Sequence, residues 1–106
     1  MDFKTLQKEI HKNAVEKGFW QSENIPEKLA LIHSEVSEAL EDYRQRNTGK
    51  LFSKNGKPCG LPVELADTII RIMDLAEFLN IDLLPIIEEK HEYNRARPYM
   101  HGGKIA

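Results

Sequence analysis

Apolar residues recur three or four positions apart in four segments of this chain, and this period restricts what the chain can fold into. Such a spacing is that of an α-helix, whereas a half-buried strand would alternate with a period of two. Stretches containing glycine and proline, which end or begin helices, separate the segments. The pattern predicts no strand, and it predicts four helices, over about residues 3–17, 26–46, 62–80 and 82–95.

The predicted fold is therefore an all-α domain whose four helices form a bundle. The length of 106 residues suits one domain with a modest core. We treat residues 1–106 as that single domain and expect residues 98–106 to be a flexible tail. Residues 47–60 are rich in glycine, lysine, asparagine and proline, and we expect them to form a loop.

The composition restricts the partners of the chain. Hydrophobic residues make up 41% and charged residues 30%, which is typical of a globular domain. The net charge of −2 gives no general attraction to nucleic-acid polymers or membrane surfaces. No apolar run approaches the roughly 20 residues that cross a bilayer, and Cys59 has no second cysteine with which to pair. We expect a cytoplasmic protein that binds neither membranes nor nucleic-acid polymers.

Acidic residues border the apolar stripe on two of the predicted helices. On a wheel of about 100° per residue, Glu35 and Glu38 lie on one shoulder of the second helix. Glu41 points to the opposite, solvent-facing side. Glu64 and Asp67 occupy the equivalent shoulder of the third helix. Antiparallel packing of the two helices could bring both pairs of carboxylates into one cleft.

Carboxylates gathered in one cleft repel one another unless cations neutralise them. Ligand sets made only of oxygen select hard ions, so the candidates are Mg²⁺ and Mn²⁺. The same spacing has a simpler explanation, because pairs of carboxylates three residues apart also arise by chance on solvated helix faces. Spacing alone therefore leaves two interpretations open, an ordinary acidic surface and a metal site.

The two acidic motifs resemble those of a known family. EVSE (Glu35–Glu38) is followed after 25 residues by ELAD (Glu64–Asp67), which resembles the E-x-x-E … E-x-x-D signature of the MazG-like, all-α nucleoside triphosphate pyrophosphohydrolases. The flanking sequences EKLALIHSEVSEALEDYR and LPVELADTIIRIMDLAEFLNIDL are similar to the second and third helices of that family. The ending KHEYNRARPYMHGGK is similar to that of some members. The resemblance covers about residues 3–104.

This resemblance implies an oligomeric, MazG-like four-helix bundle that binds Mg²⁺, with Mn²⁺ as a substitute. The matching metal ligands are Glu35, Glu38, Glu64 and Asp67. The implied reaction is hydrolysis of a nucleoside triphosphate, a deoxynucleotide or a non-standard one, between its α- and β-phosphates. The products are a nucleoside monophosphate and pyrophosphate, in a nucleotide-pool housekeeping role. Because members of the family are dimers or tetramers, we expect a homodimer or a homotetramer.

The resemblance and the local chemistry also indicate further site residues. Lys90 and Asn94 match positions expected to contact phosphate or sugar, and Arg97 is a weaker match. Trp20 precedes the metal-bearing helix, where its ring could either stack on a nucleobase or cap the core. Glu38, at the outer edge of the acidic group, is our candidate for the catalytic carboxylate that activates water.

Two other functions stay open at this point. One is a helical protein-interaction module whose acidic surface recognises a basic partner. The other is an enzyme similar to phosphoribosyl-ATP pyrophosphohydrolase. The sequence fixes neither the base and sugar preference nor the choice between dimer and tetramer.

Overall fold

The computed structural model describes residues 1–45 and 52–99, which form four helices and one small hairpin. The helices are α1 (Phe3–Glu16), α2 (Ile25–Arg44), α3 (Leu61–Phe78) and α4 (Leu83–Ala96). Between α2 and α3 lie the strands β1 (Phe52–Lys54) and β2 (Lys57–Cys59). The predicted end of the second helix at Arg46, and residues 100–106 of the predicted tail, lie outside the described residues.

Local sequence signals account for the helix boundaries. The Asp2 side chain accepts a hydrogen bond from the Thr5 amide at 2.7 Å and caps α1. Asn24 caps α2, with its side chain accepting from the Glu27 amide at 3.1 Å. Gly18, with a φ of +87°, follows the end of α1, in the left-handed conformation that glycine adopts without strain.

The prediction that the chain contains no strand is wrong for residues 52–59. β1 and β2 pair in antiparallel register, with Phe52 opposite Cys59 and Lys54 opposite Lys57. The two turn residues, Asn55 and Gly56, have φ angles of +54° and +77°. Positive φ at both positions is the requirement of the tight hairpin turn that Asn-Gly favours, and this local preference explains the hairpin. Residues 47–51 of the predicted loop lie outside the described part of the chain.

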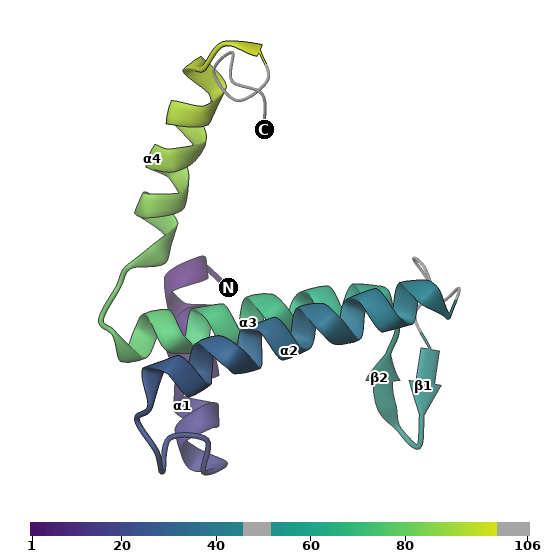
Figure 1. The fold of residues 1–106 in the computed structure, drawn as a ribbon. Coiled ribbons are helices and arrows are strands. Elements are labelled where there is room, and N and C mark those ends of the chain that lie inside the picture. The colour runs from purple at the N-terminus through teal and green to yellow at the C-terminus, as the bar shows by residue number, and fades with distance from the viewer. Residues whose placement is uncertain (46–51, 100–106) are drawn as a thin grey trace.

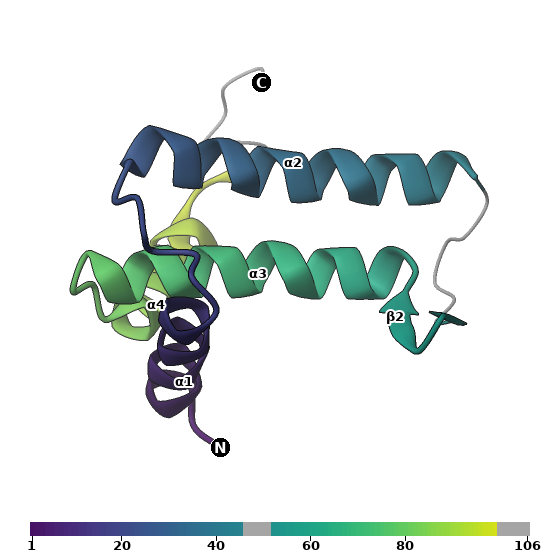
Figure 2. The same cartoon turned by 90° about the horizontal axis from the view of Figure 1, so that it is seen from below.

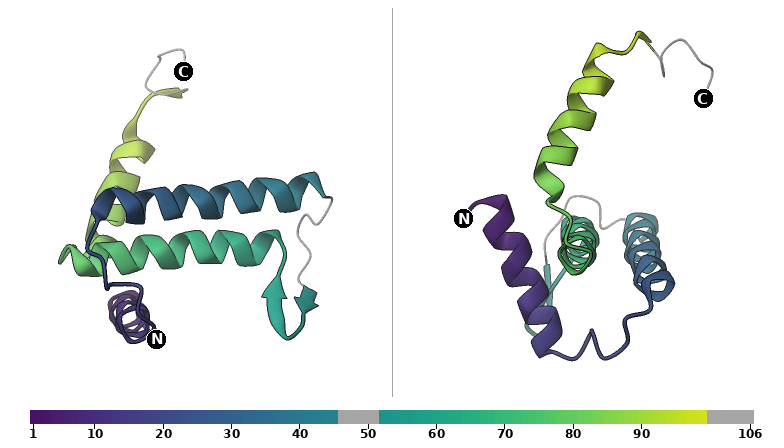
Figure 3. Two further views of the ribbon diagram at one scale, coloured as in Figure 1. Left: turned by 60° about the horizontal axis from the view of Figure 1, so that its bottom comes forward. Right: turned by 90° about the vertical axis from the view of Figure 1, so that its left-hand side faces the viewer.

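The helices α2 and α3 form an antiparallel pair that is the main body of the molecule (Figures 1 and 2). α1 packs on α3, so that α3 lies between α1 and α2 (Figure 3, right). α4 continues from the end of α3 and stands away from the α2–α3 pair (Figure 1). None of its residues is buried. The four helices therefore enclose no common core among the described residues of one chain.

The buried interior lies where α1, α2 and α3 meet. Gln7 holds α1 to the end of α3, because its side-chain amide donates to Glu77 Oε1 at 3.0 Å and to the Ile81 carbonyl at 2.8 Å. The buried apolar residues are few: Ala14, Ala39, Met73, Leu75 and Ala76. The Cα radius of gyration is 16.3 Å, whereas a compact domain of this length has about 13 Å.

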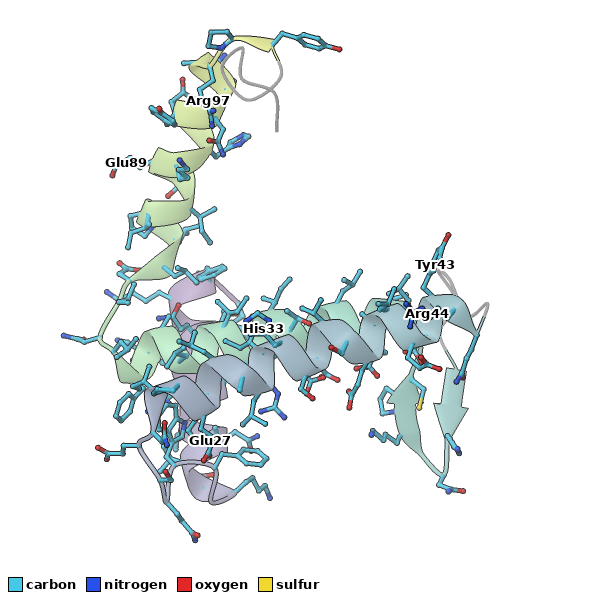
Figure 4. All side chains as sticks on the ribbon, in the orientation of Figure 1. Glu27, His33, Tyr43, Arg44, Glu89 and Arg97 are labelled. Atoms are coloured by element: carbon cyan, nitrogen blue, oxygen red, sulfur yellow. The ribbon has the colours of Figure 1, made fainter. Side chains whose placement is uncertain are left out.

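Most large residues of the apolar stripes of α2 and α3 lie outside the interior, although a bundle would bury them. Along α2 the inward positions include Lys28, Glu35 and Ala39, which are buried. Of the stripe residues, Ala39 and Ala76 are buried, whereas eight large ones are 37–61% exposed; these eight are Leu29, Val36, Leu40, Tyr43, Leu65, Ile69, Ile72 and Leu79. Figure 4 shows Tyr43 near the far end of α2. The physical reason is that α2 and α3 meet along their shoulders, which leaves these large residues on the outside.

No helix within the described ranges is long and apolar enough to cross a membrane.

Candidate metal centre

The antiparallel pairing of α2 and α3 brings carboxylates from both helices together. Glu35 comes from α2, and Glu64 and Asp67 lie three residues apart near the start of α3. One carboxylate oxygen of each lies within 4.8 Å of the corresponding oxygens of the other two. The three oxygens therefore form a compact group that one or two small cations could bridge, because oxygen ligands bind Mg²⁺ at about 2.1 Å.

Glu38 and Asp42 extend this group along α2. The Glu38 side chain is close enough to Glu64 to raise the pKa of that carboxyl. The Asp42 carboxylate is close enough for its charge to act on Glu64. Two carboxyl oxygens, Asp42 Oδ2 and Glu64 Oε2, are buried and have no hydrogen-bond partner among the described residues. We call Glu35, Glu38, Asp42, Glu64 and Asp67 the acidic cluster.

Burial and like charges raise two carboxyl pKa values in the acidic cluster. Burial is the largest cause for Glu64, and the hydrogen bond and charge of Glu38 add to it, so that the pKa rises from 4.5 to about 7. Burial and then the charge of Glu35 raise the pKa of Asp67, while Arg71 and Lys57 oppose that rise. The cluster is therefore short of positive charge. A bound divalent cation would supply that charge and partners for the two buried oxygens.

Two basic side chains, one on α3 and one on the hairpin, act on the acidic cluster. Arg71 Nε donates to Glu35 Oε1 at 2.7 Å, in an ion pair whose side chains are 34% and 10% exposed, respectively. Lys57, on β2, acts on Asp67 through its charge. The hairpin, which connects α2 to α3 in the sequence, thus contributes to the electrostatics of the site.

A cavity of about 440 Å³ opens beside the acidic cluster and extends toward α1. Glu35, Asp67 and Arg71 line its end at the cluster, and Asn13, Glu9 and Asp74 add polar groups. The remaining walls are apolar and come mainly from α1 and the residues after it: Leu6, Ile10, Ala14, Phe19 and Ile70. A cavity that combines apolar walls with convergent polar groups is typical of a small-molecule site.

Trp20 lies near this cavity but is not among its lining residues. Its indole Nε1 donates to both Asp74 oxygens, at 2.9 and 3.0 Å, and its ring stacks on Phe78 with the centroids 4.1 Å apart. His11 Nδ1 lies 2.7 Å from Asp74 Oδ1, and the Lys28 ammonium lies 4.6 Å from the centroid of the Trp20 ring. These contacts fit the core-capping alternative for Trp20, whereas its contact with a base stays a prediction.

Lys90 and Asn94, on α4, and Arg97, just after it, lie apart from the acidic cluster of their own chain. Lys90 lies over the ring of Tyr93, 4.6 Å from its centroid, and Arg97 is 5.8 Å from the same ring. Asn94 is exposed on the same helix. Figure 4 places Arg97 near the far end of α4, away from the α2–α3 pair. Their predicted contact with substrate therefore stays a prediction, and within one chain the fold does not bring them to the carboxylates.

Several residues of the site were absent from the sequence-based prediction. Asp42 follows Glu38 by four residues and Arg71 follows Asp67 by four, so each lies one helical turn beyond a predicted ligand. This spacing could have identified both Asp42 and Arg71 as site residues from the sequence. The contributions of Asn13 and Phe19 had no comparable signal, because they depend on how α1 packs against α3.

Comparisons with known proteins identify no relative of this chain. No protein-family model matches the sequence, no curated protein matches it, and no solved structure matches the fold. The similarity of the acidic motifs to the MazG-like family therefore stands on the residues quoted above.

Proposed function

We propose that the chain is a Mg²⁺-dependent nucleoside triphosphate pyrophosphohydrolase that cleaves between the α- and β-phosphates. The observation that carries the proposal is the meeting of carboxylates from two helices beside a cavity of about 440 Å³. The similarity of EVSE and ELAD to the family signature supports the same reaction. We place its role in housekeeping of the cytoplasmic nucleotide pool, with deoxynucleoside or non-standard triphosphates as substrates.

The residues of the acidic cluster have different roles in this proposal. Glu35, Glu64 and Asp67 hold the metal, and Glu38 lies beside them at the edge of the group. Bound Mg²⁺, or Mn²⁺ in its place, supplies charge neutralisation of the triphosphate and a lowered pKa for an attacking water. Glu38 accepts a proton from that water. The water oxygen bonds to the α-phosphorus, the bond from phosphorus to the bridging oxygen breaks, and pyrophosphate leaves.

The cavity suits the nucleoside part of such a substrate. Its volume lies within the usual range of about 300–1,000 Å³ for small-molecule sites. Phosphates at the Glu35 and Asp67 end would direct the sugar and base toward the apolar wall of α1. There Phe19, with 56% of its surface exposed, offers a ring on which a base can stack.

The decisive assay incubates the purified protein with Mg²⁺ and a panel of ribo-, deoxy- and non-standard nucleoside triphosphates, and with phosphoribosyl-ATP. We expect pyrophosphate and nucleoside monophosphate, and no orthophosphate. Glu38→Gln and Asp67→Asn should abolish turnover while the circular dichroism of the helices is unchanged. Glu41→Gln is the matched control, because it removes the same charge from the solvent-facing side of α2. Turnover by both site variants would refute the site, and orthophosphate alone would refute the reaction.

We also propose that the chain self-associates through the exposed apolar face of α2 and α3. The face consists of the eight stripe residues listed above, and every one of these positions is uncharged. Large exposed apolar patches are rare on monomers and mark binding surfaces. Because the face carries no net charge, a second copy can pack on it by two-fold symmetry without burying unpaired charges. The large radius of gyration and the unburied α4 also fit half of an assembly.

Mass measured in solution by light scattering distinguishes a homodimer, a homotetramer and a monomer. The variant Val36→Glu with Ile69→Glu should lower the mass to that of one chain, because both substitutions put charge in the centre of the face. Ser34→Glu with Ser37→Glu adds the same charge at exposed polar positions of α2 and should leave the mass unchanged. A monomeric wild-type chain would refute this assembly.

In the oligomer, any contact of Lys90, Asn94 or Arg97 with substrate would come from a neighbouring copy.

A further inference from the structure

Arg71 occupies the boundary between the acidic cluster and the cavity. It follows Asp67 by one helical turn on α3, and its Nε donates to Glu35 Oε1 at 2.7 Å. The Glu35 carboxylate is almost entirely enclosed, whereas a third of the Arg71 side chain is exposed and lines the cavity. The guanidinium is therefore anchored at one edge and open at the other.

Most hydrogen-bonding capacity of this guanidinium is unused. A guanidinium has five N–H donors, and the bond to Glu35 engages the one on Nε. Among residues 1–45 and 52–99, the structure gives Arg71 no other hydrogen bond or ion pair. The four N–H donors on the terminal nitrogens thus have no protein acceptor there. They form a fork that matches the oxygens of a phosphate group.

The charges around the cavity favour an anion at this one place. Four carboxylates line the cavity, from Glu9, Glu35, Asp67 and Asp74, and Arg71 is the single basic residue among its described lining. A highly charged triphosphate would be repelled by the carboxylates unless a cation met it where it enters the cluster. Metal ions on the acidic cluster supply part of that charge, and Arg71 is the protein group placed to supply more.

We propose that Arg71 is a phosphate-contacting residue, whose terminal nitrogens donate to the polyphosphate while its Nε holds the metal ligand Glu35. The identity of the substrate rests on the proposed function. In this arrangement one side chain couples the position of a metal ligand to the position of the anion. A lysine keeps the charge but lacks the rigid planar fork that orients donors toward both groups, so it should hold the two contacts less well.

The experiment measures metal binding and anion binding separately in the wild-type protein, Arg71→Gln and Arg71→Lys. Electron paramagnetic resonance counts bound Mn²⁺ with no anion present. Calorimetry measures the affinity for inorganic tripolyphosphate, titrated as its Mg²⁺ complex. Arg95→Gln is the matched control, because Arg95 forms an ion pair with Glu92 on α4 at 2.6 Å and does not line the cavity.

We expect Arg71→Gln to bind tripolyphosphate about 10- to 100-fold more weakly, since charge-assisted hydrogen bonds are lost. Its Mn²⁺ affinity should be equal to that of the wild type or higher, because a neighbouring positive charge is gone. Arg71→Lys should fall between the two in anion affinity, and Arg95→Gln should match the wild type. This split between metal and anion affinity is not expected of a residue that only supports Glu35.

Two results would overturn the proposal. One is tripolyphosphate binding by Arg71→Gln within twofold of the wild type, and the other is a parallel loss of Mn²⁺ binding. If the proposed function is wrong, the experiment gives a different result. A wild-type protein that binds Mn²⁺ and tripolyphosphate through Arg71 but hydrolyses no nucleoside triphosphate would refute the reaction and leave the role of Arg71 intact.

Discussion

Glu64→Gln should change how the stability of the metal-free protein depends on pH. The pKa of Glu64 is raised from 4.5 to about 7 by burial and by the neighbouring Glu38, so the native state binds a proton that the unfolded chain has already lost within that window. Stability therefore falls as the pH rises from 4.5 to about 7. Glutamine keeps the shape of the side chain and cannot ionise, so the variant should lose this dependence.

The size of the effect follows from the same shift. A difference between 4.5 and about 7, at about 1.4 kcal/mol for each pH unit, corresponds to about 3.5 kcal/mol for a fully enclosed group. Glu64 is only partly buried, and solvent screens its interaction with Glu38, so we expect about 1 kcal/mol. For a chain of this length that free energy corresponds to a shift in melting temperature of about 4 °C.

Thermal unfolding in the presence of a chelator, at about pH 5 and about pH 8, measures this directly. The wild type should be less stable at the higher pH by more than Glu64→Gln is, and Glu41→Gln, on the exposed side of α2, should behave as the wild type. Added Mg²⁺ should stabilise the wild type most at the higher pH, because metal binding requires the ionised carboxylate. Metal-free stability that rises with pH through the window, or identical profiles for both variants, would refute the reasoning.

Three further substitutions test the parts of the fold that position the site. Asp74→Asn removes the carboxylate that accepts from Trp20 and pairs with His11, and we expect a loss of about 2 kcal/mol in urea unfolding; unchanged stability would show that these bonds contribute nothing. Asn24→Ala should cost about 1 kcal/mol by removing the cap of α2, whereas Ser22→Ala, whose hydroxyl bonds only the Asn24 amide at 3.4 Å, should be nearly neutral by the same measurement. Gly18→Ala places a Cβ on a backbone with a φ of +87° and should lower the unfolding free energy by about 1–2 kcal/mol; an equally stable variant would contradict the left-handed conformation.

The helices could be predicted from the sequence because their period and caps are local. Each predicted helix begins and ends within two residues of the observed one wherever the chain is described. The hairpin was missed although Asn55 and Gly56 are its strongest signal. Its three-residue strands are too short to show alternation, and Pro58 argues against a strand within β2.

The face that each helix buries could not be predicted in the same way. The stripe through Val36 and Leu40 shows that this side of α2 avoids water, but the pattern does not say which molecule covers it. Within one chain the inward side also carries Lys28 and Glu35, which the stripe does not include. The shoulder positions of the four predicted carboxylates were readable from the wheel, because they depend only on the helical angle and on antiparallel pairing.

The position of the only tryptophan of this chain gives the site an internal spectroscopic reporter. The Trp20 indole donates to Asp74, and the Asp74 side chain forms part of the cavity wall. A molecule that enters the cavity and binds the Asp74 carboxylate changes the electric field at the Trp20 indole N–H group. The emission of the unlabelled protein therefore reads the occupancy of the cavity, independently of whether any bond in the ligand is broken.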